Sequence, residues 1–362
     1  MQKQGLSSLA LQKFKKSFWG VFSFWFIMFM AFISVFAYVL APDSSKYSNQ
    51  MHLSIHSKPP GFSVPILVVP NSLNEDQNFF NRIFFGDANP ATEIPISTHR
   101  FDLTNIYYTT YASDGLKGLE NSIEIPLNFP MLSRPFVTQR MFYFGTDKYG
   151  RDLLSRILVG ARISFSIGFV AVFISLLIGV FLGSIAGYFG GKWDAVIMWV
   201  INVTWSIPTL LLVIAITLAL GKGFWQVFIA VGLTMWVEVA RIVRGQVMSV
   251  KEMQYVNAAR ALGFTDFRII VKHILPNILA PVIVISAANF AAAILIESGL
   301  SFLGIGAQPP MSSWGAMIKD HYNYIIVGKP YLALIPGLCI MSLVMAFMLI
   351  GNTLRDALDV KA

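Results

Sequence analysis

Cysteine and charge are both scarce in this chain. Cys339 is the only cysteine among 362 residues, which excludes an intrachain disulfide framework and argues against a thiolate metal cluster. Only 13% of the residues are charged, whereas about a quarter are charged in a soluble domain. Hydrophobic residues make up 55% of the chain, and 30 residues are Phe. This composition is typical of a membrane protein.

Two catalytic signatures are also missing. The chain has no G-x-x-x-x-G-K-[ST] run, so it has no phosphate-binding loop of that type. His52 and His56 are spaced like metal ligands on a helix, and His99 follows, but no H-E-x-x-H motif or acidic partner of matching spacing accompanies them. A membrane metalloenzyme is therefore a weak alternative. We predict no metal site and no catalytic residue.

The net charge of +8 does not indicate a nucleic-acid partner. The basic residues form short clusters at the edges of apolar runs rather than one polar face. Lys and Arg gather instead on one side of the predicted spans. Because such residues favour the cytoplasmic side, we expect both termini in the cytoplasm and the segment after the first span outside. Lys148, Arg151, Arg156 and Arg162 do not fit this rule, since they crowd the outer end of the second span.

Six segments are candidates to cross a membrane, for which a helix needs about 20 mainly apolar residues. The first is too long for a signal-peptide core and lacks an A-x-A cleavage pattern, so we interpret it as a retained anchor. The fourth is weaker, because it must continue through Glu238 and Arg241, which are placed to pair on one helix face. The segments are Phe18–Leu40, Ile163–Phe189, Ala195–Leu220, Phe224–Gln246, Ile278–Ile296 and Tyr331–Leu354.

The domain organisation follows from these spans. We predict a cytoplasmic N-terminus and first transmembrane helix over 1–41, an extracytoplasmic insertion with short strands and turns over 42–157, a five-helix core over 158–356 and a cytoplasmic tail over 357–362. The core contains a cytoplasmic loop at 247–277. The fold class is an all-α polytopic membrane protein with one large insertion after its first helix.

Three features inside the spans are candidates for packing or function. Gly179, Gly183 and Gly187 continue a stripe of small residues that begins at Ala171 and allows another helix, from this chain or a second subunit, to approach closely. Pro208 would kink the third span, either to line a pathway or only to shape packing. Glu297 is an intramembrane carboxylate, although it is predicted near the outer end of its span, where water could reach it.

The segment Asn257–Asn277 carries several charges between two spans. Placing Arg260, Arg268 and Lys272 at the bilayer centre would cost about 2.5 to 3.5 kcal/mol each, so the segment must lie outside the hydrocarbon. We predict a helix that ends at Gly263 and a second one capped by Thr265 or Asp266. The second helix has an apolar stripe, which could lie on the membrane, on its own bundle or in a partner's groove. The stripe is Phe267, Ile270, Val271 and Ile274.

This segment resembles the cytoplasmic signature of binding-protein-dependent ABC importer permeases. In that signature Glu-Ala-Ala is followed after three residues by Gly and after nine more by Ile-x-Leu-Pro. Ala258, Ala259, Gly263, Leu275 and Pro276 stand in matching places, while Asn257 replaces the Glu and His273 replaces the Ile. Further motifs resemble, in order, the C-type permease of the dipeptide, oligopeptide and nickel class: 144–164, 187–194, 240–247, 300–315 and 354–359.

The resemblance implies six transmembrane helices of the type I ABC importer permease fold in a bacterial inner membrane. It implies a second permease subunit, two cytoplasmic ATPase subunits that carry ATP and Mg, and an extracytoplasmic substrate-binding protein, with no cofactor on this chain. The ATPase-coupling residues would be Asn257, Ala258, Ala259, Gly263, Phe267, His273, Leu275 and Pro276. His273 is expected to pack on a helix face, and the substituted Asn257 removes any salt bridge that the usual Glu makes.

A transporter or channel driven by an ion gradient is the alternative. Such proteins usually contain internal repeats and, where protons move, several buried carboxylates. The sequence has no clear repeat, and Glu297 and Glu238 are the only plausible carboxylate pair. The importer subunit is therefore the favoured hypothesis, with peptides as the expected solutes.

Overall fold

The computed structural model describes residues 6–70, 78–102, 104–112, 116, 118–124, 135–221 and 223–358. The chain divides into two compact units. The first unit, which holds most of the helices, consists of 1–30, 164–308 and 338–362. The second unit consists of 31–163 and 309–337, so the loop and short helix before the last span join the insertion rather than the helical core.

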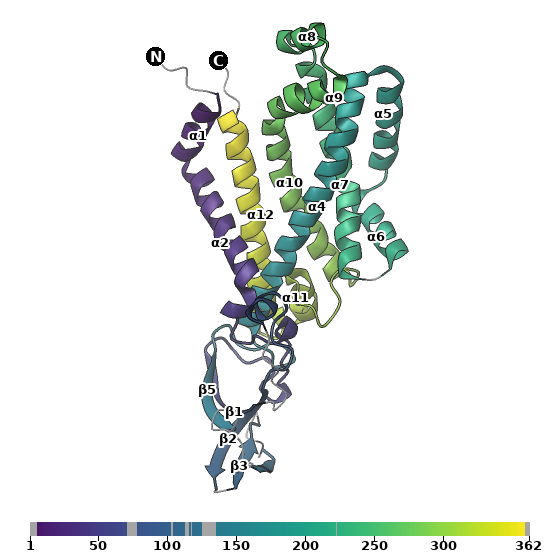
Figure 1. The fold of residues 1–362 in the computed structure, drawn as a ribbon. Helices are drawn as coiled ribbons and strands as arrows, with labels where there is room; N and C mark the ends of the chain where they lie inside the picture. The colour runs from purple at the N-terminus through teal and green to yellow at the C-terminus, as the bar shows by residue number, and fades with distance from the viewer. Residues whose placement is uncertain are drawn as a thin grey trace. The chain divides into compact units, whose positions relative to one another are not determined.

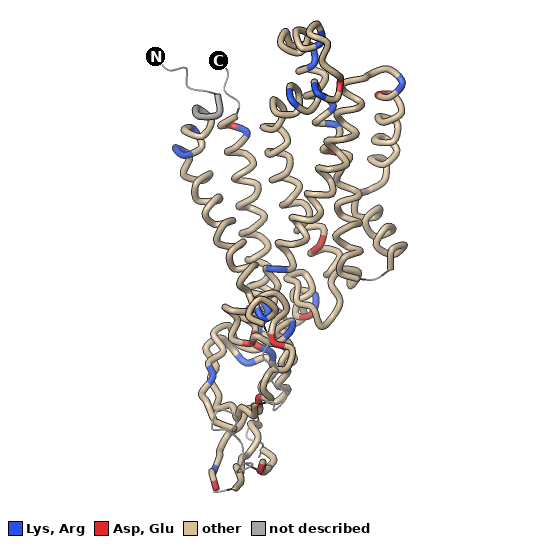
Figure 2. The backbone as a smooth tube through the Cα atoms, in the orientation of Figure 1, with Lys and Arg blue, Asp and Glu red and all other residues tan. Residues whose placement is uncertain are grey.

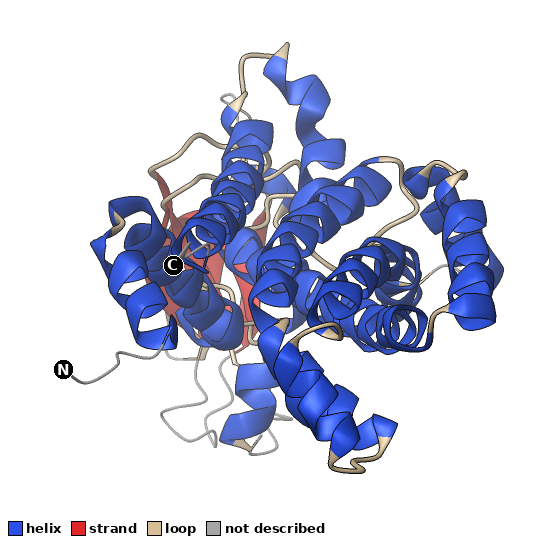
Figure 3. Cartoon of the chain, turned by 90° about the horizontal axis from the view of Figure 1, so that it is seen from above, coloured by secondary structure: helices blue, strands red, loops and turns tan. Residues whose placement is uncertain are grey.

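Long apolar helices dominate the chain (Figure 1). Five are long and apolar enough to cross a membrane individually, and the bent pair of α5 and α6 is long and apolar enough to form a sixth span. The helices of this set are α2 (Phe18–Leu40), α4 (Leu153–Phe189), α5 (Gly191–Trp205), α6 (Thr209–Leu220), α7 (Phe224–Val250), α10 (Leu279–Phe302) and α12 (Tyr331–Leu358). Short helix α1 (Leu6–Lys16) precedes them. Figure 3 shows the helices of the first unit side by side, many of them viewed nearly along their axes.

The third span is broken rather than merely kinked. Helix α5 ends at Trp205, α6 begins at Thr209, and the two axes differ by 92°. Pro208 lies at the N-cap of α6, where its missing N–H removes no helical hydrogen bond. The expected effect of Pro208 is thus present, and it is larger than a kink.

Helices α4 and α7 approach each other almost backbone to backbone. A Cβ atom added at Gly179 would lie 2.5 Å from Val239 Cβ, and one added at Gly183 would lie 2.5 Å from the carbonyl oxygen of Ala240. One added at Gly187 would lie 2.8 Å from the carbonyl oxygen of Arg244. The stripe of small residues therefore packs inside this chain, against α7, as expected where lipid provides no hydrophobic drive.

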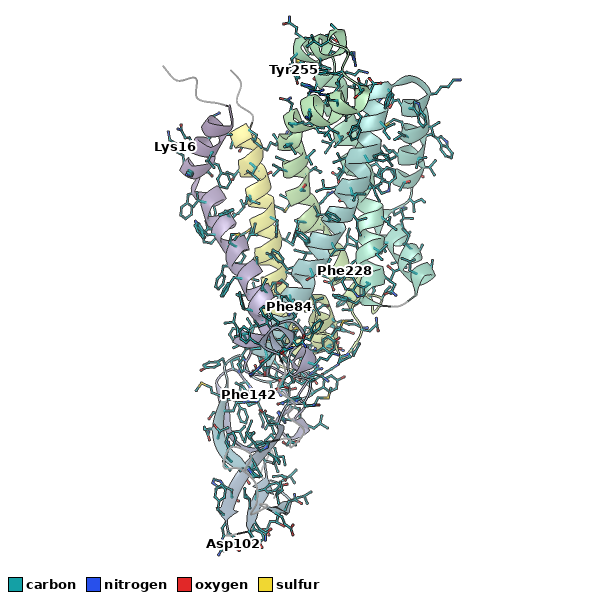
Figure 4. The ribbon with its side chains drawn as sticks, in the orientation of Figure 1. Lys16, Phe84, Asp102, Phe142, Phe228 and Tyr255 are labelled. Atoms are coloured by element: carbon teal, nitrogen blue, oxygen red, sulfur yellow. The ribbon has the colours of Figure 1, made fainter. Side chains whose placement is uncertain are left out.

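The core of the first unit lies around α7. Val227, Phe228 and Val231 of α7 form one buried cluster with residues of α4, α6 and α10. Val243 and Val247 of the same helix form a second cluster further along. Figure 4 labels Phe228 among the packed helices and Tyr255 on α8 (Gln254–Ala261), at one end of the unit. Helix α7 is thus the element that the other helices share.

The second unit contains a five-stranded antiparallel sheet of order β4-β3-β2-β1-β5. Its interior strand β1 is buried on both faces, because Val64, Ile66 and Val68 pack on one side and Leu67 on the other. Phe142 of β5, labelled in Figure 4, joins the first of these clusters. The strands are β1 (Phe62–Val69), β2 (Thr92–Phe101), β3 (Asn105–Thr110), β4 (Glu120–Glu124) and β5 (Phe136–Phe142). The insertion therefore has a folded core of its own.

The contact between α4 and α7 leads to a stability prediction. Gly183→Ala should destabilise the protein by about 1 to 3 kcal/mol, because the new methyl group overlaps the backbone of α7. The matched control is Gly245→Ala, where a Cβ meets nothing within 4 Å. That change should be neutral or stabilising by up to about 1 kcal/mol, since Ala favours a helix over Gly. Thermal unfolding of both variants in detergent distinguishes them, and equal midpoints would contradict the packing.

Candidate functional site

The coupling segment, Gln254–Asn277, is the first candidate site. Helix α8 ends at Ala261, and Gly263 two residues later terminates it with a φ of +76°, in the left-handed region that favours glycine. Helix α9 (Asp266–Ile269), a π-helical turn (Ile270–Ile274) and a 3₁₀ turn (Leu275–Asn277) follow. Thr265 occupies the N-cap of α9 without a side-chain capping bond. The predicted two-helix arrangement is present, with a tighter and less regular second half.

Buried apolar residues attach this segment to the long helices. Val256 and Ala259 of α8 pack with Ile269 and Ile274 against α7 and the end of α4. At the same place the Tyr188 hydroxyl donates to Asp266 Oδ1 over 2.6 Å. The segment is therefore anchored to α4 and α7, and a displacement of one is transmitted to the others.

The predicted apolar stripe of the second helix is partly wrong. Ile274 is buried and Ile270 half-buried, but Phe267 is 77% exposed and Val271 is 41% exposed. Ile269, which was not part of the prediction, is fully buried. The reason is the π-helical turn, because its wider spacing brings residues five apart, Ile269 and Ile274, onto one face.

The exposed side of the segment carries large apolar side chains among its charged ones. Phe267 is joined there by Leu262, which is 73% exposed, and by the exposed side chains of Met253 and Tyr255. Ala258 is exposed as well. Since isolated large side chains are normal on surfaces but a cluster marks a contact site, this surface is suited to a protein partner.

The remaining residues of the predicted signature have local roles. Asn257 is exposed, and its Nδ2 lies 3.5 Å from the carbonyl oxygen of Glu252. His273 stacks on Phe264 at 5.8 Å, as expected for a packing residue, while Arg268 lies over the same ring at 4.1 Å. Leu275 is half-buried, and Pro276 is exposed in the closing turn. The segment thus folds without the carboxylate that the signature has at position 257.

Glu297 lies deeper than predicted. Helix α10 continues past it to Phe302, and the residue is 0% exposed. Its Oε1 accepts a hydrogen bond of 2.6 Å from the Ser301 hydroxyl, which in turn accepts one from the backbone N–H of Ala307. The carboxylate therefore helps to hold the turn that follows α10.

The charged pair predicted in the fourth span does not form. No ion pair joins Glu238 and Arg241 in the part of the chain that the structure describes. Arg241 Nη2 instead donates to Asn202 Oδ1 over 3.1 Å, and its guanidinium lies 3.7 Å from the centre of the Trp205 ring. Three residues on, Arg244 forms a two-pronged ion pair with Asp194. Both arginines therefore contact side chains of α5.

The basic residues that contradicted the orientation rule have partners within the second unit. Asp147 accepts from the backbone and side chain of Arg151, and it lies 3.6 Å from Arg156. Lys148 pairs with Asp320 at 3.0 Å. Arg162 donates to the carbonyl oxygen of Ile83 and lies over the Phe84 ring. Asp152, four residues before Arg156, accepts from the backbone and hydroxyl of Ser155. Figure 2 shows these charges against a largely uncharged chain.

Two distant sequence motifs meet in the second unit. The Ser312 hydroxyl donates to the carbonyl oxygen of Arg156, and Trp314 Nε1 donates to that of Ile157. Trp314 is fully buried beside Gly160, where a Cβ would lie 2.9 Å from the indole. Trp314 begins helix α11 (Trp314–His321). Its indole therefore belongs to the core of the unit and offers no surface to a partner.

His52, one of the histidines of the insertion, lies beside a carboxylate. His52 Nε2 lies 3.5 Å from Glu93 Oε2, and Glu93 is also paired with Arg140. Among the described residues no group of three or more His, Cys, Asp or Glu side chains is placed to hold a metal ion.

Comparison with known proteins gives two family matches. The binding-protein-dependent transport system inner membrane component family matches residues 179–361. The N-terminal TM domain of oligopeptide transport permease C matches residues 5–60. The chain belongs to the binding-protein-dependent permease family.

Three relatives show how close the likeness is. The dipeptide transport system permease protein DppC of Alkalihalophilus pseudofirmus is 44% identical over 219 residues, which cover 60% of this chain and 72% of that protein. The glutathione transport system permease protein GsiD of Escherichia coli O157:H7 is 42% identical over 219 residues, which cover 60% of this chain and 72% of that protein. The oligopeptide transport system permease protein OppC of Haemophilus influenzae is 42% identical over 231 residues, covering 64% and 74%.

These matches establish the permease as a multi-pass inner-membrane component of an ABC importer with the type I fold. The family is one of transport components, which work with an ATPase and a substrate-binding protein. The alternative of an ion-driven transporter or channel is not favoured.

Several contacts in the permease were not predicted. The bond from Tyr188 to Asp266, the stack of Arg241 on Trp205 and the double pairing of Asp147 join residues far apart in sequence or compete with a nearer partner. Among these contacts, only the pair of Asp147 with Arg151 could have been predicted from the sequence, because the two residues are spaced i, i+4. That ion pair is present in the structure.

A buried histidine makes the stability of the permease dependent on pH. His321 Nδ1 lies 2.7 Å from the carbonyl oxygen of Met317 and donates to it, while Nε2 accepts from the Lys148 N–H. Burial lowers the pKa of His321. The unfolded chain therefore binds a proton that the folded chain resists, so stability falls as the pH drops through about 6.5. His321→Gln should weaken this dependence, as measured by unfolding midpoints across that range. If the unfolding midpoint of His321→Gln depended on pH as steeply as that of the wild type, His321 would not be the source of the pH dependence.

Proposed function

We propose that this permease forms the translocation pathway for peptides together with a second permease subunit, and that residues Asn257–Pro276 couple it to two cytoplasmic ATPases. ATP and Mg are bound by those ATPases, and an extracytoplasmic binding protein delivers the peptide. The relatives named for dipeptide and oligopeptide transport support peptides as the substrate class. This chain contributes no catalytic residue in the proposal.

The coupling role is supported by one observation: one side of the coupling segment is buried against the long helices, and the other side is exposed. Its inner side, with Val256, Ala259, Ile269 and Ile274, is buried against α4 and α7. Its outer side presents Phe267 and Leu262 to solvent. A helix that is packed against its own protein on one side and exposes large apolar side chains on the other is suited to bind in a groove on a partner. Closure of the ATPases would then move α4 and α7 through these buried contacts.

We place the coupling segment and both termini in the cytoplasm. Within the first unit, α8 lies at the same end as α1 and the C-terminal end of α12 (Figure 1), and Lys and Arg are concentrated at that end (Figure 2). Basic residues at one end of the spans favour the cytoplasmic side.

This orientation has a direct test. A cysteine introduced by Arg268→Cys, with Cys339→Ser to remove the native thiol, should react with a membrane-impermeant maleimide only from the cytoplasmic side, because Arg268 lies on the exposed face of the coupling segment. Labelling of right-side-out and inside-out vesicles measures this. Reaction from the exterior would reverse the topology and remove the coupling role.

The coupling itself is tested by Phe267→Ser. Truncating an aromatic residue at the centre of an interface typically weakens binding by about 2 kcal/mol or more, which is roughly 30-fold. We therefore expect loss of ATPase co-purification and of ATP-driven peptide uptake by the reconstituted importer. Ile326→Ser is the matched control, since Ile326 is 90% exposed but lies in the second unit. Wild-type coupling in the Phe267 variant would contradict the proposal.

A further inference from the structure

The break in the third span leaves polar groups at a depth where lipid would not tolerate them. Helix α5 has 15 residues, so its end at Trp205 lies about 22 Å along the span from its start, inside a hydrocarbon layer of roughly 30 Å. The chain leaves the α-helical path after Ser206, and Ser206, Ile207 and Pro208 are all exposed. Exposed non-helical backbone at such depth occurs only where protein covers it or where it lines a water-filled cavity.

Helix α7 has charged groups at a similar level. Glu238 of α7 is exposed. Arg241 is half-buried one turn further along, with Asn202 and Trp205 of α5 as its contacts. Within the described part of the chain no carboxylate pairs with Arg241. An exposed carboxylate and an arginine without a counter-ion in one span are functional candidates.

The outer face of α4 is different. Phe169, Phe173, Leu177 and Phe181 recur every fourth residue there, and all are more than half exposed. This stripe is apolar along its whole length, as a lipid-facing helix should be. The surface at the break of the third span carries polar and charged groups, so it cannot face lipid in the same way. It is formed by Asn202, Trp205, Ser206, Glu238 and Arg241. We call it the break surface.

The two charges of the break surface are complementary to a free peptide. Glu238 and Arg241 are three residues apart, which places their Cβ atoms about 5 to 6 Å from each other. They do not neutralise each other, because Arg241 is turned toward α5 by Asn202 and Trp205. A carboxylate and a guanidinium held apart in this way fit the ammonium and the carboxylate of a short zwitterionic peptide, which brings no net charge into the membrane.

We propose that the break surface lines the aqueous translocation pathway and recognises the two termini of the transported peptide. Arg241 binds the C-terminal carboxylate, and Glu238 binds the N-terminal ammonium group. Asn202 and Trp205 are positioning residues, since they orient the guanidinium. The proposal rests on the proposed function, because it identifies a specificity site for peptide transport.

Access of water to the surface is tested by cysteine labelling of the assembled importer that lacks Cys339. Ser206→Cys should react with a water-soluble, membrane-impermeant maleimide, whereas Leu177→Cys on the apolar stripe of α4 should not. Protection of Ser206→Cys in every nucleotide state would place the surface against lipid or protein and overturn the proposal.

Recognition of the termini is tested by transport. The complete importer is reconstituted with its binding protein, and uptake of a free dipeptide is compared with uptake of its C-terminal amide and of its N-acetyl form. In Arg241→Gln the preference for the free carboxylate should fall at least tenfold while the preference for the free amine remains. Glu238→Gln should show the reverse pattern. Because all variants use one binding protein, its own selectivity cancels.

Arg244→Gln is the matched control, since Arg244 lies on the same helix but is paired with Asp194. It should keep both preferences, even if its total uptake changes. Unchanged preferences in Arg241→Gln and Glu238→Gln would overturn the inference while leaving peptide transport intact. Uptake of no peptide by the wild-type importer would instead refute the proposed substrate class, and with it the inference.

Discussion

The close contact of α4 with α7 is the constraint on which the rest of the first unit depends. Lipid gives two helices no hydrophobic reason to associate, so their attraction must come from close packing over a long contact. Gly179, Gly183 and Gly187 make this possible, because their missing side chains let the backbone of α7 approach. Helix α7 then contributes to each buried cluster around it and leads directly to the coupling segment.

This arrangement gives the coupling segment a mechanical connection to the third span. Ile269 and Ile274 pack on α7, and α7 holds α5 through the ion pair of Arg244 with Asp194. The bond from Tyr188 to Asp266 ties α4 to the same point. A displacement of the coupling segment therefore acts on α4, α5 and α7 together, and on α6 through its packing against α7.

The buried polar groups of the second unit stabilise its fold, unlike the polar groups at the break of the third span. Asp147 is fully buried and lies within ion-pair distance of Arg151 and Arg156, and the Trp314 indole donates a hydrogen bond in the same core. Removal of one partner in such a cluster would leave a buried charge without compensation, which typically costs about 3 to 5 kcal/mol. The contacts between residues 144–162 and 312–321 therefore stabilise the fold of the second unit. The candidate functional residues lie in the first unit.

The sequence by itself determined the membrane class, the positions of the spans, the turn at Gly263 and the existence of a separate insertion. Those properties follow from hydrophobic run length and from local backbone preferences, which neighbouring residues decide. The tertiary structure alone decided which side chains pair. Arg241 turned to Asn202 and Trp205 rather than to Glu238, and Arg156 to Asp147 rather than to Asp152. It also exposed Phe267, because a π-helical turn changed the face that the segment buries. Such choices depend on distances between elements far apart in the chain, and a local spacing carries no information about them.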